Sequence, residues 1–163
     1  MDNESQIKQN EKIWPKAVIM DLDGTLIDSV PDITMGLNGA FVDAGFDPFS
    51  IDEVRYMIGG GVPKLVERAF DARSLPHDEK MAEVIAGVLK HYSAKPADNT
   101  LIYDGVVLTL KRLAEKGVKV GLCTNKPHSI TLKVLDQLGM TAYFDAIVGG
   151  TDDTPRKPDP LTL

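Results

Sequence analysis

The stretch Asp21-Leu22-Asp23-Gly24-Thr25-Leu26 holds the residues best suited to chemistry in this 163-residue sequence. It follows the short apolar run from Ala17 to Met20, which is typical of a strand buried on both faces of a parallel sheet. Ligands bind open α/β sheets beyond the carboxyl ends of their strands, so we expect Asp21 and Asp23 to face one crevice. Two carboxylates there favour Mg²⁺ and offer a nucleophile and a general acid. Alone, the stretch is equally compatible with a solvated turn.

Two further polar clusters follow predicted strands. The apolar run from Val118 to Cys123 ends in Thr124-Asn125-Lys126, whose hydroxyl and backbone N–H groups can hold phosphate oxygens ahead of a helix. The run from Ala146 to Val148 precedes Lys157, which can supply a positive charge to a phosphoryl group. Taken singly, Thr124 is better explained as a helix cap and Lys157 as a solvated surface charge. Because all three clusters come in order after strands, we predict one phosphate-handling site.

The elements that must position these clusters alternate along the chain. Helical periodicity occupies residues 106–113, before the second strand, and residues 130–138, between the second and third strands. Gly117 and Gly139 end these helices. Strand, helix, strand, helix, strand indicates an α/β fold with a parallel sheet and right-handed crossovers.

Residues 29–95 break this alternation with four successive amphipathic helices. Two helix starts carry a capping-box signature, Ser29 with Asp32 and Ser50 with Glu53. We therefore predict three regions: a polar N-terminal segment at 1–15, an α/β core at 16–28 and 96–163, and a helical domain inserted at 29–95.

Composition narrows the class of protein. The chain has 18 Lys and Arg against 24 Asp and Glu, a net charge of −6, which disfavours nucleic-acid binding. Its one Cys cannot form an intrachain disulfide, and no apolar run approaches the roughly 18 residues of a transmembrane helix. Residues 1–12 are polar and lack the apolar core of a secretory signal. We expect a soluble, cytoplasmic protein without membrane or nucleic-acid partners.

The three clusters resemble the motifs of the haloacid dehalogenase (HAD) superfamily of phosphatases. The stretch from Asp21 to Thr25 is similar to its first motif, Thr124-Asn125 to its second and Lys157-Pro158 to its third. The helical insertion resembles its cap domain, and the likeness spans nearly all of Lys16 to Leu163. Within the family, the chain is most similar to the phosphatases that hydrolyse 2-phosphoglycolate. This resemblance implies a HAD-like Rossmannoid sheet with an all-helical cap after the first strand.

The resemblance also implies roles for individual residues. Asp21 is the nucleophile that becomes an aspartyl-phosphate, and Asp23 is the general acid and base. Thr124, Asn125 and Lys157 bind the phosphoryl group, with Thr124 and Lys157 counted as catalytic. Mg²⁺ is held by Asp21 and the backbone carbonyl of Asp23. This assignment suits phosphoryl transfer, which depends mainly on positioning and charge stabilisation.

A run of three glycines, Gly59-Gly60-Gly61, precedes a helix of the predicted cap. Its backbone N–H groups can approach a small phosphorylated carboxylate, with Gly60 and Gly61 as substrate-binding residues. A flexible turn between helices explains the run equally well.

The family's fourth motif, an acidic pair that completes the Mg²⁺ site, has no counterpart before Leu163, since Asp152 and Asp153 precede Lys157. We therefore expect a sheet that is incomplete at the C-terminus, with an open apolar edge available for self-association.

The function expected first is Mg²⁺-dependent hydrolysis of 2-phosphoglycolate to glycolate and phosphate. A phosphatase for another small phosphate, such as a sugar phosphate or pyrophosphate, and a phosphomutase are alternatives of the same superfamily. A different class of alternative is a truncated, inactive chain that binds only a ligand or a partner. The acidic pair missing from the sequence motivates that last hypothesis.

Overall fold

The computed structural model describes residues 14–151 and 155–162. The predicted polar segment at 1–15 lies almost wholly outside these residues, as do Asp152 and Asp153. Within the described part, no helix is both long and apolar enough to cross a membrane.

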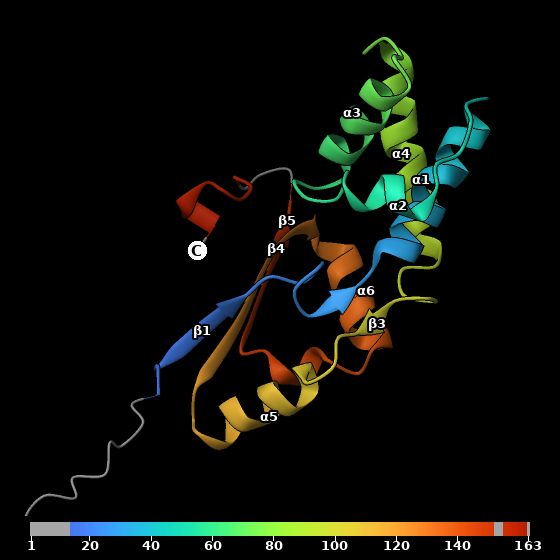
Figure 1. Ribbon diagram of the computed structural model, residues 1–163. Coiled ribbons are helices and arrows are strands. Elements are labelled where there is room, and N and C mark those ends of the chain that lie inside the picture. The colour runs from blue at the N-terminus through green and yellow to red at the C-terminus, as the bar shows by residue number, and fades with distance from the viewer. Residues whose placement is uncertain (1–13, 152–154, 163) are drawn as a thin grey trace, which may run out of the picture.

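A parallel sheet carries the three polar clusters. Its strands, in the spatial order β1-β4-β5, are β1 (Ala17–Met20), β4 (Lys119–Pro127) and β5 (Ala146–Gly150). Met20 lies beside Leu122, and Cys123 beside Val148, so the strands end near one another. Helices α5 (Val106–Glu115) and α6 (His128–Gln137) pack on this sheet (Figure 1). The predicted order of parallel strands and crossover helices is confirmed.

The prediction that β1 is buried on both faces was wrong. Val18 and Met20 pack against the core, but Ile19 is 55% exposed, and Val148 of β5 is 42% exposed. The reason is that α5 and α6 cover one face of the sheet (Figure 1). Among the described strands β1 is also at the edge of the sheet, as expected, and self-association through that edge stays a prediction.

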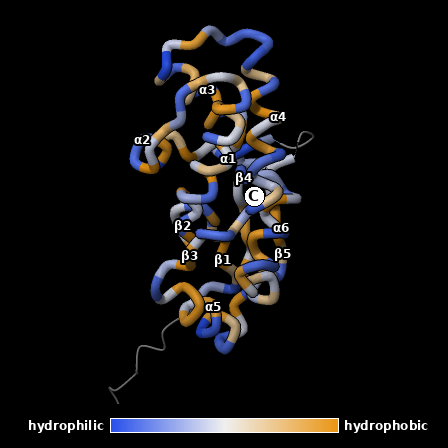
Figure 2. Tube along the Cα trace, turned by 90° about the vertical axis from the view of Figure 1, so that its right-hand side faces the viewer, coloured by the Kyte–Doolittle hydropathy of each residue, from blue (hydrophilic) through white to orange (hydrophobic). Residues whose placement is uncertain are grey.

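Four helices form a second group, called here the helical unit. They are α1 (Val30–Asp43), α2 (Ile51–Arg55), α3 (Val62–Ala72) and α4 (Glu79–Ala94). Phe41 is at their centre, with its ring 5.0 Å from that of Phe49 and 5.8 Å from that of Phe70. In Figure 2 this unit lies at one end of the molecule and α5 at the other. Burial of apolar and aromatic faces therefore holds the unit together.

Glycine lets α1 and α4 approach closely. A Cβ atom on Gly36 would lie 2.9 Å from Cβ of Tyr92, too close for any other residue type without a shift of the helices. This contact seats Tyr92 firmly against α1.

The two segments that join the helical unit to the sheet are tied together. Strands β2 (Ile27–Asp28) and β3 (Leu101–Ile102) pair antiparallel, a ribbon that sequence patterns did not predict because each strand has two residues. Asp32, 1% exposed, accepts hydrogen bonds from the Asn99 backbone N–H at 2.9 Å and the Thr100 hydroxyl at 2.6 Å. The buried Asp32 carboxylate therefore links the two segments that join the helical unit to the sheet.

The predicted capping box at Ser29 and Asp32 is wrong. Ser29 caps no backbone N–H of α1, because its hydroxyl and the Asp32 carboxylate both bond to other segments. Two short 3₁₀ helices, η1 (Thr141–Tyr143) and η2 (Pro160–Thr162), complete the described fold.

Candidate active site

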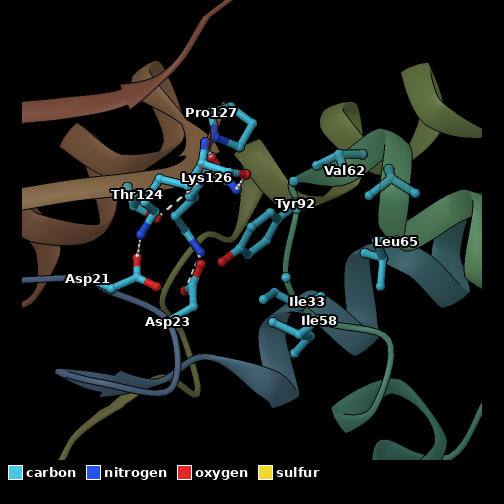
Figure 3. Close-up of a pocket in the computed structure, with 16 residues that line it drawn as sticks. Asp21, Asp23, Ile33, Ile58, Val62, Leu65, Tyr92, Thr124, Lys126 and Pro127 are labelled. Carbon is cyan, nitrogen blue, oxygen red and sulfur yellow. Dashed lines mark hydrogen bonds and ion pairs between the residues drawn. The ribbon is translucent and has the colours of Figure 1, made fainter. Parts of the chain in front are cut away.

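A cavity of about 170 Å³ lies between the strand ends and the helical unit (Figure 3). The wall from the strand ends is polar and contains Asp21, Asp23, Thr124, Asn125, Lys126 and Lys157. The wall from the helical unit is mainly apolar and contains Ile33, Ile58, Gly59, Gly60, Gly61, Val62, Leu65, Val88 and Tyr92. All seven residues predicted for the site, from three strand ends and one glycine loop, therefore line one cavity.

Asp21 follows β1 and points one oxygen at a cation. Its Oδ1 accepts the Leu22 backbone N–H at 2.8 Å and lies 2.9 Å from the ammonium of Lys157. That ammonium also donates to the Cys123 carbonyl at 2.7 Å. No described residue donates to Oδ2 of Asp21, so this oxygen is available for a reaction in the cavity.

Asp23 repeats this pattern two residues later. Its Oδ1 accepts hydrogen bonds from the Ser29 hydroxyl at 2.5 Å and the Lys126 ammonium at 2.7 Å. No described residue donates to Oδ2. Gly24, at φ +75°, lets the chain turn sharply after Asp23, and its N–H bonds the Ile27 carbonyl at 2.9 Å. Each carboxylate thus has one oxygen held by an ammonium and one left free.

Thr124 and Asn125 differ in what their side chains do. Thr124 is buried, and its hydroxyl accepts the Lys126 backbone N–H at 3.2 Å. The Asn125 amide bonds the backbone of Lys157 twice, accepting its N–H at 2.8 Å and donating to its carbonyl at 3.0 Å. Asn125 therefore anchors the segment that carries Lys157, and its direct contact with substrate stays a prediction.

The glycine loop closes against the end of β4. Gly59, Gly60 and Gly61 have φ angles of +111°, +85° and +85°, a region that favours glycine. A Cβ atom on Gly61 would lie 2.9 Å from the Asn125 carbonyl oxygen. The Arg68 guanidinium donates to the carbonyls of residues 57 and 59 at 2.7 and 3.0 Å. These contacts connect the loop to α3 and to the end of β4.

Lys126 and Tyr92 line the cavity, although the sequence analysis assigned no role to either side chain. The Lys126 side chain is 2% exposed, and its ammonium lies 4.7 Å from the centre of the Tyr92 ring. Tyr92 is 3% exposed, and its hydroxyl has no hydrogen-bond partner among the described residues. Burial, reinforced by the negative charges of Asp23 and Asp32, raises the pKa of Tyr92 well above its ordinary value. The hydroxyl therefore remains a proton donor.

The signals that could have found these two residues differ. Lys126 is adjacent to the second motif, so its position beside Thr124-Asn125 was available from the sequence. Tyr92 sits in the apolar stripe of α4, where helical spacing predicts an ordinary core residue.

The donor chemistry of the polar wall fits Mg²⁺. Two carboxylates, Asp21 and Asp23, line the cavity, and Mg²⁺ usually binds one or two carboxylates with waters and substrate phosphate. Within residues 14–151 and 155–162, no group of three or more His, Cys, Asp or Glu side chains could hold a metal ion by itself. The carboxylate pair is therefore a partial ligand set that a phosphate group can extend.

The chain is similar to known proteins of one family. The family model for haloacid dehalogenase-like hydrolases matches residues 15–163. Phosphoglycolate phosphatase of Cereibacter sphaeroides strain ATCC 17025 is 42% identical over 147 residues, covering 90% of this chain and 67% of that protein. Phosphoglycolate phosphatase 1 of Pseudomonas aeruginosa is 41% identical over 152 residues, covering 91% of this chain and 56% of that protein. The chain thus spans between half and about two thirds of these relatives.

A crystal structure of a predicted phosphoglycolate phosphatase from Haemophilus somnus has the same architecture. It superposes with a TM-score of 0.80 at 28% identity, over 88% of this chain and 66% of that one. The expected HAD-like fold is confirmed, and the expected phosphatase is confirmed at the level of the family and these relatives. The strand-end site, the fold and the match over residues 15–163 agree, and the chain belongs to the haloacid dehalogenase-like hydrolases.

Proposed function

We propose that this protein is a phosphomonoester hydrolase whose substrate is 2-phosphoglycolate. The observation that carries the proposal is the pair of carboxylates in the cavity, Asp21 and Asp23, each with one oxygen held by an ammonium and one free. The names of the relatives from Cereibacter sphaeroides and Pseudomonas aeruginosa support the choice of substrate.

In the first step, Oδ2 of Asp21 attacks the phosphorus atom. The bond between phosphorus and the ester oxygen breaks, and Asp23 gives its proton to that oxygen as glycolate leaves. Asp21 is then an aspartyl-phosphate. The ion pair to Lys157 and the Leu22 N–H hold Oδ1, which orients Oδ2 for attack.

In the second step, water attacks the phosphorus atom of the aspartyl-phosphate. Asp23 accepts a proton from this water, inorganic phosphate is released, and the Asp21 carboxylate is restored. The hydrogen bonds from Ser29 and Lys126 to Oδ1 of Asp23 keep Oδ2 directed to the cavity in both steps.

Positive charge and hydrogen bonds support the phosphoryl group throughout. Lys157 and Thr124 contact its oxygens, and Asn125 keeps the Lys157 backbone in position. Asp21 and the backbone carbonyl of Asp23 would hold Mg²⁺, which would supply further charge neutralisation. Preorganised charge of this kind is the main requirement of phosphoryl transfer.

We further propose that the helical unit is a cap that selects substrates by size. The glycine loop and the apolar residues of the helical unit form one wall of the cavity, whose volume is about 170 Å³. The leaving group of a bound substrate therefore meets this wall, which supports selection by size.

A second candidate is binding of a phosphorylated ligand without turnover. It is favoured by one observation, that the described residues provide two acidic metal ligands and no third. Turnover that depends on Asp21 would eliminate this candidate.

The test is phosphate release from 2-phosphoglycolate by the purified chain with and without Mg²⁺. We expect release that needs Mg²⁺, and a fall of at least about 1,000-fold in Asp21→Asn, which keeps the size but loses the nucleophile. Asp136→Asn, the same change on the exposed face of α6, is the matched control and should behave like the wild type. Activity retained in Asp21→Asn would contradict the mechanism.

A further inference from the structure

The Tyr92 hydroxyl is a buried polar group that the fold leaves without a partner. Tyr92 is 3% exposed, lines the cavity, and forms no hydrogen bond through its hydroxyl to any described residue. Buried side-chain polar atoms in native proteins usually have at least one partner. A phenylalanine would fill the same space without this cost, so packing alone does not account for the hydroxyl.

The ring that carries this hydroxyl is enclosed, since Tyr92 is only 3% exposed. Gly36 of α1 packs against the Cβ and backbone of Tyr92, and the Lys126 ammonium lies 4.7 Å from the ring centre. Figure 3 shows the hydroxyl directed toward Asp23 and Lys126, at the polar wall of the cavity. The hydroxyl is therefore preorganised toward the place where the leaving group meets the general acid.

The surroundings of this hydroxyl suit an anionic group. The Lys126 ammonium forms a 2.7 Å ion pair with Asp23, which weakens the repulsion that a second carboxylate would otherwise meet. An ammonium has three N–H donors, and one of them bonds Asp23, so others are free for a ligand. Among the lining residues of the helical unit, Tyr92 has the only polar side chain.

We propose that the Tyr92 hydroxyl, next to the Lys126 ammonium, binds the carboxylate of the substrate and so determines specificity. This inference rests on the proposed function, because it assumes a leaving group of the glycolate type. Lys157 and Thr124 hold the phosphoryl end, and Tyr92 with Lys126 holds the other end. The helical unit thus recognises through one hydroxyl what distinguishes 2-phosphoglycolate from simple alkyl phosphates.

The test measures binding by isothermal titration calorimetry with two ligands, 2-phosphoglycolate and ethyl phosphate, which lacks the carboxylate. The Asp21→Asn chain is used so that the ligands are not hydrolysed. We expect Tyr92→Phe in this background to weaken 2-phosphoglycolate binding by about tenfold or more, as for a lost hydrogen bond to a charged group, and to leave ethyl phosphate binding within about twofold.

Two controls separate recognition from structure. Tyr56 is 86% exposed, and Tyr56→Phe makes the same chemical change outside the cavity, so it should alter neither affinity. Thermal unfolding without ligand should show that Tyr92→Phe is no less stable, because the removed hydroxyl has no partner in the free protein.

Three results would overturn the inference. Unchanged 2-phosphoglycolate affinity in Tyr92→Phe, or an equal loss for both ligands, would remove the role of the hydroxyl in carboxylate recognition while leaving the phosphatase proposal intact. If the parent chain bound ethyl phosphate as tightly as 2-phosphoglycolate, both the inference and the proposed substrate would fail.

Discussion

Helices α1 and α2 begin with the same spacing of residue types and use them in opposite ways. At α2, Ser50 accepts the Glu53 N–H at 3.3 Å and Glu53 accepts the Ser50 N–H at 2.7 Å, a closed capping box. At α1, the Ser29 hydroxyl bonds the carboxylate of Asp23, and Asp32 bonds residues 99 and 100. At the start of α2, the capping groups bond each other. At the start of α1, the side chains belong to the cavity and to the junction between the helical unit and the sheet.

Burial explains this difference. Ser29 and Asp32 are each 1% exposed, while the bonds within the Ser50 box are exposed. Buried charges need hydrogen-bond partners of good geometry. The carboxylates of Asp23 and Asp32 therefore accept hydrogen bonds from donors on the segments that pack against them. On an exposed helix end no distant segment competes, and the local box forms. The same signature therefore contributes to a cap in one place and to a site in the other.

Asp32→Ala should give the largest effect, because it breaks the buried junction. The Asn99 N–H and the Thr100 hydroxyl would be left unsatisfied, and we expect a loss of about 3 kcal/mol in the free energy of unfolding, measured by urea denaturation. Glu53→Ala, at the equivalent position of the exposed start, should cost clearly less. Equal losses would contradict the comparison.

Ser29→Ala should affect the reaction more than the fold. It removes one of the two donors to Oδ1 of Asp23, so we expect kcat for 2-phosphoglycolate to fall about tenfold. Helix α1 should remain, since Ser29 donates no cap to it, and far-ultraviolet circular dichroism checks this point. If Ser29→Ala had a normal kcat but lost the helical signal of α1, Ser29 would be a helix cap and not a residue that holds Asp23.

Ser50→Ala should affect the fold and leave the reaction unchanged. Loss of the N-cap hydroxyl should reduce the free energy of unfolding by about 1 kcal/mol, with kcat and KM as in the wild type. The measurement is urea denaturation together with phosphate release. A change in kcat would show that α2 is coupled to the cavity.

The smallest effect concerns the acid dependence of the exposed start. The Ser50 N–H, the Ser50 hydroxyl and Arg73 lower the pKa of Glu53 from 4.5 to about 2. Because the pKa of Glu53 is lower in the folded state than in the unfolded state, the ionised carboxylate stabilises the folded state at pH values above about 4.5. This contribution is lost as the pH falls from about 4.5 toward 2. The stability difference between wild type and Glu53→Gln, from urea denaturation at pH 6 to 2.5, should therefore shrink in that range. A constant difference would contradict the shifted pKa.

Local patterns were enough for the elements and for most of the candidate site. The apolar runs at Ala17–Met20 and Ala146–Val148, and the polar clusters after them, could be read because a strand end follows from a change in a few adjacent residues. Ligands bind at the carboxyl ends of parallel strands, and this rule predicted that the three clusters lie close together.

Position along a helix did not reveal chemistry. Tyr92 lies in the apolar stripe of α4, and its spacing is that of a core residue whether or not its hydroxyl meets a ligand. Likewise the two-residue strands β2 and β3 are too short for any periodicity, and they form only because their segments are brought side by side.

The sequence by itself determined the alternating strands and helices, the helical insertion, and the order of the three polar clusters, because these depend on neighbours within a few residues. The tertiary structure alone decided which distant groups meet. Asp23 bonds Lys126 across 103 positions, and Asp32 bonds Asn99 across 67. Such partners are selected by burial, which forces each enclosed charge to bond whatever donor the packing of separate elements brings within reach.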